Sequence, residues 1–289
     1  MSGEVVPVLG SGPWSPLRIA VYRSMWIAAL VSNVGTFMHI VAAGWAMTSL
    51  TDSPTLVGLV QTSWAVPGFA LALHAGAFAD MVERRRLIAL TQVLALAIAA
   101  ALGVLEMTGN LGVTTLLAGT FFESVALTIA APAFMALTPQ LVGTQYLSQA
   151  FGLDSVSRNI AQSVGPALAG AVIAFTNPGA VFILNAVSFV GILFVVRKLP
   201  TLSAQVESAS KINHVIRDGI KHVVHTAQLR NIALRLALVL GATASLNSVM
   251  PVVAKQSLNV GSSGFGVLPA ALGVGSVLAV WLLPIMRTK

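Results

Sequence analysis

The stretch from Leu56 to Ala79 most constrains what this chain can fold into, because it contains no formally charged side chain. A helix of this length is long enough to cross the roughly 30 Å hydrocarbon core of a bilayer. Charged residues then cluster between Asp80 and Arg86, and a second apolar stretch begins at Leu87. The pattern predicts a hairpin of two membrane-spanning helices whose charged turn lies in water.

The composition indicates that the rest of the chain is also a membrane protein. Hydrophobic residues make up 56% of the sequence and charged residues only 9%, where a soluble domain has about 25% charged residues. The net charge of +7 could attract nucleic acid, but basic residues between spans act as topology signals. We therefore expect the lipid bilayer, and no nucleic acid, as a partner. The lack of cysteine excludes disulfides, thiolate metal sites and thiol nucleophiles.

The hydrophobic pattern predicts an all-α, polytopic membrane helix bundle with eight spans. Turn signals separate the spans at Ser53-Pro54, Gly109-Asn110 and Asn177-Pro178-Gly179. We interpret Thr138 to Gln149 as a polar connection. The predicted spans cover residues 24–50, 56–80, 87–105, 111–135, 150–175, 180–196, 232–249 and 265–284.

A polar and basic segment, residues 197–230, divides the chain into two parts. Its apolar residues between Ile212 and Val224 recur at helical spacing, which predicts an amphipathic helix on the membrane surface. The expected domains are a six-helix half (1–196), a cytoplasmic linker (197–230) and the first two helices of an incomplete second half (231–289).

Charge also predicts the orientation of the chain. With a cytoplasmic N-terminus, all but two of the 16 basic residues fall on the cytoplasmic side of the membrane. The exceptions are Lys255 in an external loop and Arg158 inside a span. This asymmetry is typical of the positive-inside rule, so we expect a multi-pass protein whose N-terminus is cytoplasmic.

Two motifs resemble those of major facilitator superfamily transporters. GAFADMVERR, from Gly76 to Arg85, resembles the superfamily's loop motif G-x-x-x-D-R-x-x-R-R, with Met81 where arginine is usual. GPALAG, from Gly165 to Gly170, resembles the antiporter motif G-P-x-x-G-G. The phrases SLTDSP, PAFMALTPQLV and VFILNAVSF resemble the enterobactin-exporter-like branch, whose members are transmembrane secretion effectors.

This resemblance, from about Leu17 to Met286, implies a secondary active transporter in the bacterial inner membrane. The implied activity is proton-coupled efflux of a small amphipathic molecule, such as a siderophore or a drug. Members have twelve helices, so we expect either a fragment or a truncated reading frame, with the missing C-terminal helices absent or supplied by a second chain.

Two alternatives to a transporter stay open. One is a truncated, non-transporting remnant of such a carrier. The other is a membrane scaffold or enzyme, which the lack of phosphate-loop, zinc and nucleophile-elbow patterns disfavours. His222 and His225 have metal-ligand spacing, but no carboxylate or cysteine supports them. We therefore expect no metal and no cofactor.

Ionisable residues inside spans are costly and point to function. The candidates for proton coupling are Glu123, Asp154, Arg158 and His39. Asp154 and Arg158 are four residues apart and share a helix face, and Glu123 lies at a depth from which it could meet Arg158. One charge of the three stays uncompensated or protonated, as proton coupling requires; the alternative is a static buried pair with a neutral third member.

The resemblance also implies a cytoplasmic latch at the loop motif, formed by Gly76, Asp80, Arg84 and Arg85. In that motif Asp80 pairs with Arg84 or Arg85, and Gly76 permits close helix approach. The alternative is that the arginines only fix topology.

Two further sets of residues complete the candidate site. Gly165, Pro166 and Gly170 predict a kink in the fifth span. The resemblance to antiporters implies that this kink gates the outer side; the alternative is an ordinary packing kink. Polar and aromatic residues inside spans either line a substrate path or join helices by hydrogen bonds; these are Asn33, Gln61, Trp64 and Asn159.

Overall fold

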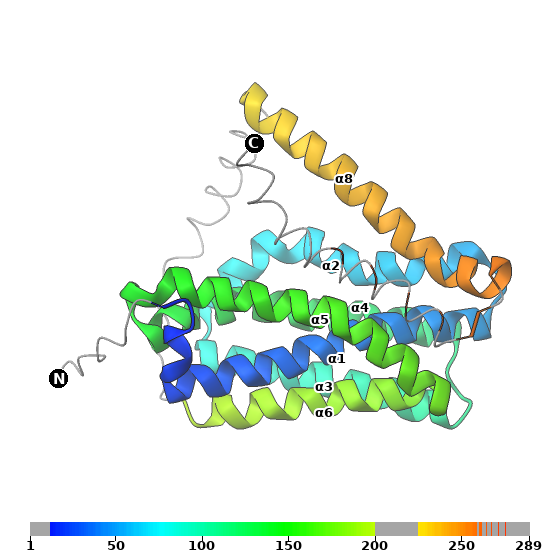
Figure 1. Cartoon of the computed structure of the whole chain (residues 1–289), viewed down its shortest axis with the longest axis horizontal. Helices are drawn as coiled ribbons and strands as arrows, with labels where there is room; N and C mark the ends of the chain where they lie inside the picture. Colours follow the sequence, from blue (N-terminus) through cyan, green and yellow to red (C-terminus); the bar gives the residue numbers. More distant parts are fainter. Residues whose placement is uncertain are drawn as a thin grey trace.

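The structure is a computed structural model that describes residues 12–199 and 225–258, with single positions beyond them. The described part is helical and contains no strand. Six helices form a bundle, and a seventh leaves it at an angle (Figure 1). They are α1 (Ala20–Leu50), α2 (Pro54–Met81), α3 (Arg84–Met107), α4 (Val113–Val142), α5 (Leu147–Phe175), α6 (Pro178–Arg197) and α8 (Ala227–Val252).

Helix α1 is central to the bundle, because it packs along both α5 and α6. Helix α3 packs between α6 and α4, and α2 packs on α4. The far end of α8 and the short π-helical turn η3 (Val253–Ser257) lie against α2 and the end of α1. The all-α bundle predicted from the sequence is therefore confirmed. The eighth predicted span and the amphipathic linker helix lie outside the described residues, so the eight-span count and the domain division stay predictions.

Within the described part of the chain, four helices are long and apolar enough to cross a membrane by length and composition, namely α1, α3, α4 and α6. Helices α2 and α5 have similar lengths, 28 and 29 residues. Helix α5 carries the charged pair Asp154 and Arg158 within its length. Ionisable side chains in such positions face a cavity or a partner rather than lipid.

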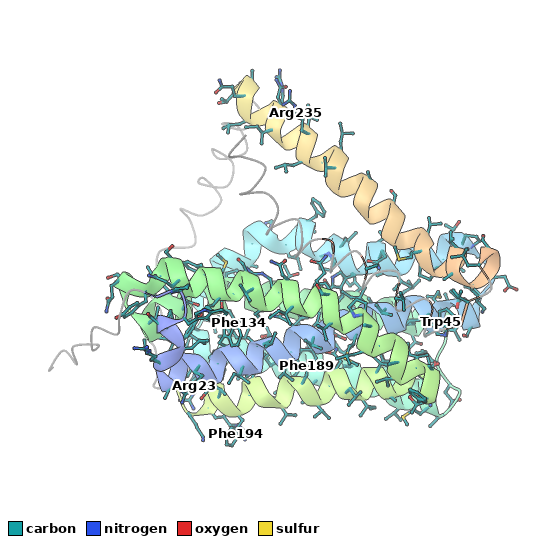
Figure 2. All side chains as sticks on the ribbon, in the orientation of Figure 1. Arg23, Trp45, Phe134, Phe189, Phe194 and Arg235 are labelled. Atoms are coloured by element: carbon teal, nitrogen blue, oxygen red, sulfur yellow. The ribbon has the colours of Figure 1, made fainter. Side chains whose placement is uncertain are left out.

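Helix α6 shows how one helix serves both the core and the membrane. Phe189 is fully buried between α3 and α4, whereas Phe194 is 60% exposed and points away from the bundle (Figure 2). Lys198 at the end of α6 lies over the ring of Phe194, 4.2 Å from its centroid. An outward apolar face with a basic residue at its end is typical of a lipid-facing helix near the interface.

The polar connection predicted between Thr138 and Gln149 is wrong. Helix α4 continues to Val142, and α5 already begins at Leu147 after a single 3-10 turn, η2 (Thr144–Tyr146). The Thr138 hydroxyl donates to the Phe134 carbonyl oxygen at 3.3 Å, so this threonine is satisfied within a helix. The chain reverses at Gly143, whose φ of 75° favours glycine.

Other predicted helix ends are confirmed. The Asn177 side chain accepts a hydrogen bond from the Ala180 amide at 3.0 Å, and Pro178 is the first residue of α6. Pro54 likewise opens α2, and Gly109 turns the chain after α3 with a φ of 71°.

One close approach positions the functional residues. A Cβ atom on Gly35 of α1 would lie 2.7 Å from Ser188 Oγ and 2.8 Å from Asn185 Oδ1, both on α6. Only glycine therefore allows α1 and α6 to meet at this level. The polar side chains of α6 lie against α1 as a result.

Candidate functional site

Glu123 of α4 is fully buried between α1 and α6. Asn185 Nδ2 donates to Glu123 Oε1 at 2.8 Å, and His39 Nδ1 lies 3.3 Å from Glu123 Oε2. All three side chains are 0% exposed. We call Glu123, His39 and Asn185 the sealed cluster.

The sealed cluster is polar but only partly hydrogen-bonded. Among the described residues, three atoms of the cluster have no aligned hydrogen-bond partner: both ring nitrogens of His39 and Glu123 Oε2. Aromatic rings hold the imidazole instead: its centroid lies 4.8 Å from the ring of Phe182 and 6.4 Å from that of Trp64.

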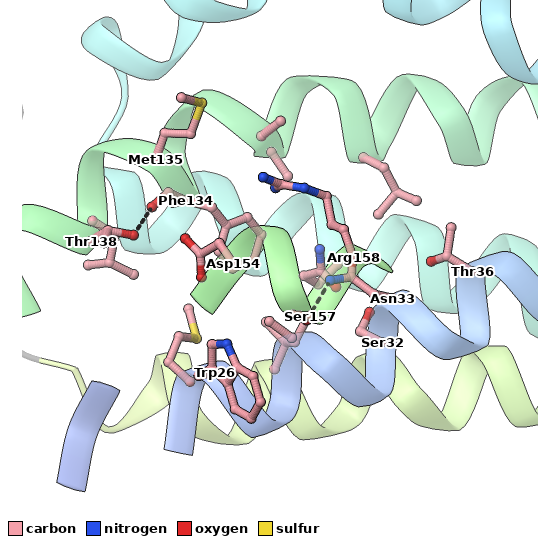
Figure 3. Close-up of a pocket in the computed structure, with 18 of the residues that line it drawn as sticks. Trp26, Ser32, Asn33, Thr36, Phe134, Met135, Thr138, Asp154, Ser157 and Arg158 are labelled. Atoms are coloured by element: carbon pink, nitrogen blue, oxygen red, sulfur yellow. Dashed lines mark hydrogen bonds between the residues drawn. The ribbon is translucent and has the colours of Figure 1, made fainter. Parts of the chain in front are cut away.

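A cavity of about 360 Å³ lies in the half of the bundle that contains the starts of α1, α3 and α5 (Figure 3). Much of its wall is apolar, with Met25, Phe134 and Met135 among the lining residues. Two charged side chains line it, Asp154 and Arg158 of α5. A volume of this size suits a small organic molecule.

Hydrogen bonds join α1 to α5 along the cavity wall. The Tyr22 hydroxyl lies 3.1 Å from the Ala150 carbonyl oxygen and 3.5 Å from Asp154 Oδ1, so its one proton serves two acceptors. Trp26 Nε1 donates to the Leu153 carbonyl oxygen at 2.9 Å. Asn33 Nδ2 donates to Ser157 Oγ at 3.2 Å, the dashed contact in Figure 3.

Asp154 and Arg158 share a helix face, as the sequence predicted, but do not form an ion pair. Among the described residues, no Lys, Arg or His nitrogen lies within 4.0 Å of the Asp154 carboxylate. The Arg158 guanidinium has no hydrogen-bond partner in the same part of the chain. Both side chains face the cavity (Figure 3).

The structure therefore places the ionisable candidates in two sites rather than one. Glu123 contacts His39 and Asn185, and the approach of Glu123 to Arg158 suggested by their depths is absent. Trp64 lies between the two sites, since it lines the cavity and its ring neighbours that of His39. Its carbonyl oxygen accepts a hydrogen bond of 2.6 Å from Ser124 Oγ, which fixes α2 on α4.

The four substrate-path candidates are divided by this geometry. Asn33 and Trp64 line the cavity, whereas Gln61 and Asn159 do not. Tyr22, Trp26 and Gln92 line it and were missed from the sequence. Gln92 of α3 is 1% exposed, and its Oε1 has no partner among the described atoms. A systematic search for amides inside spans would have found both Gln92 and Asn185.

The arginines of the loop motif contact backbone carbonyls. Arg85 Nη1 and Nη2 donate to the carbonyl oxygens of Leu199 and Arg197, at 2.8 and 2.9 Å, and so cap the end of α6. Arg84 Nη1 donates to the Ala136 carbonyl oxygen of α4 at 3.4 Å. Asp80 lies in the last turn of α2, but its side chain lies outside the described part, so its pairing stays a prediction.

Gly76 differs from expectation, because a Cβ atom there would meet no described atom within 4 Å. A close helix approach at Gly76 is therefore not found.

The proline motif of α5 lies against α1. A Cβ atom on Gly165 would lie 2.7 Å from Phe37 Cβ and 3.1 Å from the Val34 carbonyl oxygen. Gly165, Pro166 and Gly170 are all buried, and α5 changes direction in its second half (Figure 1). The motif thus brings α5 close to α1, while its gating role stays a prediction.

No metal site is visible in the described part of the chain, where no three or more His, Cys, Asp or Glu side chains gather. The described helices have the fold of the major facilitator type. Residues 11–289 match the sequence profile of one family, described as transmembrane secretion effector, and the chain belongs to that family.

Curated relatives and a solved structure agree with this assignment. The chain is 24% identical over 261 residues to the staphyloferrin A transporter of Staphylococcus aureus, covering 87% of this chain and 64% of that protein. It is 26% identical over 262 residues to the uncharacterized MFS-type transporter y4rN of Sinorhizobium fredii, covering 89% and 65%. These relatives are transporters rather than enzymes.

The fold resembles a bacterial homolog of the human lysosomal transporter Spinster, solved in an inward-facing and unoccupied conformation. The TM-score is 0.70 at 13% identity, over 95% of this chain and 64% of that one. The chain thus spans 64 to 65% of the length of these proteins.

Proposed function

We propose that this chain acts in proton-coupled export of a small amphipathic molecule, such as a siderophore or a drug, across the bacterial inner membrane. The family and the relative named as a staphyloferrin A transporter support export of this kind. The observation that carries the proton coupling is the sealed cluster, in which a fully buried carboxylate faces an imidazole next to a ligand-sized cavity.

The sealed cluster offers a partner for each of two protonation arrangements. An ionised Glu123 faces an imidazolium on His39, and a neutral carboxyl group faces a neutral imidazole. The Asn185 amide can donate to Oε1 in both cases. These two arrangements contain the same proton and differ only in whether Glu123 or His39 holds it. Uptake or release of a proton would therefore change the net charge of the buried cluster by one, and that cost in a low-dielectric interior would bias the bundle toward a conformation that solvates the cluster.

Orientation is part of this proposal. With the N-terminus in the cytoplasm, the cavity lies in the cytoplasmic half of the bundle, where an exporter takes up its substrate. Reporter fusions at Arg86 should then give a cytoplasmic signal, and fusions at Gly109 and Asn177 an external one. A cytoplasmic signal at Asn177 would reverse the direction of transport that we assign.

The loop motif would serve as a brace that releases during transport. Arg84 and Arg85 tie the start of α3 to α4 and to the end of α6, on the side where the cavity must open and close. Asp80→Asn should then stop transport but leave insertion intact. Normal transport by that variant would mean that the motif serves topology alone.

The transport function is tested in proteoliposomes with a carrier completed by the part of the staphyloferrin A transporter that this chain does not match. An imposed pH gradient should drive accumulation of staphyloferrin A or ethidium, and substrate addition should in turn dissipate a pH gradient. Accumulation that is indifferent to a proton ionophore would contradict proton coupling.

A further inference from the structure

Two opposite charges line one wall of the cavity without forming an ion pair within 4.0 Å. Asp154 and Arg158 are one helical turn apart on α5, a spacing at which ion pairs commonly form. Yet the guanidinium is more than 4.0 Å from the carboxylate, although both face the same space. Figure 3 shows both side chains at the open volume between α4 and α5.

Both groups keep unused binding capacity. A guanidinium has five donor hydrogens and can hold a carboxylate or phosphate with two parallel hydrogen bonds. No described residue accepts from Arg158. From the described residues, the Asp154 carboxylate receives only a long contact of 3.5 Å from Tyr22, whose hydroxyl also serves Ala150.

Several uncharged polar side chains of the lining already bond to the protein. Trp26 and Asn33 both donate to atoms of α5, and the Thr138 hydroxyl donates within α4. Asp154 and Arg158 are the two charged residues of the lining, and the uncharged Gln92 Oε1 is also without a partner among the described atoms.

We infer that the cavity takes a zwitterionic amphiphile, whose anionic group binds Arg158 and whose cationic group binds Asp154. The apolar body of the ligand packs against Trp26, Phe134 and Met135. This inference adds a substrate class to the export function proposed above and rests on it. It goes beyond the match to a family of transporters, which assigns no ligand to these residues.

Opposite charges a turn apart discriminate against ligands with a single charge. An anion placed on Arg158 meets the repulsion of Asp154, and a cation placed on Asp154 meets that of Arg158. A neutral ligand displaces water from both groups and returns no hydrogen bond of equal strength. A dipolar head satisfies the two groups together.

Three fluorescent probes with one apolar group and matched tethers separate these cases. Nε-dansyl-lysine has a zwitterionic head, dansylcadaverine lacks the carboxylate, and dansylaminohexanoic acid lacks the amine. The purified chain in dodecyl maltoside, a nonionic detergent, provides the binding site. Energy transfer from Trp26 and Trp64, which line the cavity, reports binding.

The native chain should bind Nε-dansyl-lysine about tenfold more tightly than either analogue, since a hydrogen bond to a charged group carries at least that much discrimination. Arg158→Gln should change the preferred probe to dansylcadaverine, and Asp154→Asn should change it to dansylaminohexanoic acid. Ser155→Ala, on an exposed residue of α5 outside the cavity lining, should keep the native order.

A change in probe preference excludes a merely structural effect, because a misfolded cavity would weaken all three probes alike. Equal weakening in both variants, or no preference in the native chain, would overturn the inference. Either result would leave pH-driven export untouched, since the measurement is of binding alone.

A zwitterionic head can belong to a free metabolite or to a lipid. Lysophosphatidylethanolamine and free lysine are therefore added as competitors of Nε-dansyl-lysine. If the lipid displaces the probe from the native chain but not from Arg158→Gln, the ligand has a lipid head. Displacement by lysine identifies a free amino-acid-type head. Displacement by neither would contradict the assignment of a zwitterion site.

Discussion

The sealed cluster and the cavity hold the ionisable groups of the bundle in opposite surroundings. In the sealed cluster, Glu123 is 0% exposed and its neighbours come from two other helices. In the cavity, Asp154 and Arg158 belong to the same helix and face open space. The two carboxylates therefore have different surroundings. Under the proposals above, Glu123 would exchange a proton within the protein, whereas Asp154 would bind a ligand.

Trp64 makes the two regions neighbours without merging them. Its ring lies 6.4 Å from that of His39 on one side and borders the cavity on the other. Under the proposed function, Trp64 would connect ligand binding in the cavity to proton exchange in the sealed cluster.

Removing a carboxylate should lower the stability of the protein much more in the sealed cluster than in the cavity, and this is the largest effect that we expect. Glu123→Ala leaves the Asn185 amide and His39 buried without a partner, and should lower the free energy of unfolding by about 2–3 kcal/mol. Asp154→Ala should cost less than about 1 kcal/mol. Unfolding of the purified variants in mixed detergent micelles measures both, and equal losses would contradict the distinction.

A somewhat smaller loss of stability is expected from overpacking the contact between α5 and α1. Helix α5 carries the cavity charges, and α1 carries His39. Gly165→Ala would place a Cβ atom 2.7 Å from Phe37 Cβ and near the α1 backbone. Overpacking of this kind costs about 1–3 kcal/mol.

Gly152→Ala in the same helix is the matched control, because its Cβ atom would meet nothing within 4 Å. It should be neutral or stabilise by up to about 1 kcal/mol. If both alanines had the same effect, the contact between α5 and α1 would not be as close as described.

The smallest change in stability, about 1 kcal/mol, is expected for Trp64→Phe, which should also give reagents in the cavity access to His39. Trp64→Phe replaces the indole between the regions with a smaller ring, so reagents in the cavity should reach His39. Diethylpyrocarbonate labelling followed by mass spectrometry should modify His39 in this variant and not in the native chain. The exposed His74 should react in both and serves as an internal control. Reaction of His39 in the native chain would mean that the cluster is not sealed.

Much of the fold follows from local sequence signals. Asn177 and Pro178 begin a helix because an amide side chain and a fixed φ satisfy its first turn, and long uncharged stretches require helices in a bilayer. The break expected at Thr138 failed for a physical reason. Within a membrane helix, a threonine hydroxyl can bond to its own backbone and proline is tolerated, so these residues do not end α4.

The candidate site was only partly predictable. Ionisable residues inside spans stand out in any sequence, which identified Glu123, Asp154 and Arg158. Depth alone does not tell which face of a helix meets which neighbour, so the partners of Glu123 could not be predicted. The key contact comes from Asn185, and it exists because Gly35 lets α6 approach α1. Such pairing is a property of three-dimensional packing.

The most direct test of two separate sites compares Glu123→Gln with Arg158→Gln in the completed carrier. Glutamine at position 123 keeps the acceptor for Asn185 but cannot exchange a proton. We predict that Glu123→Gln abolishes accumulation driven by a pH gradient and preserves substrate exchange without a gradient, whereas Arg158→Gln abolishes both. Unchanged pH-dependent accumulation by Glu123→Gln would contradict the account and make Glu123 a static buried side chain.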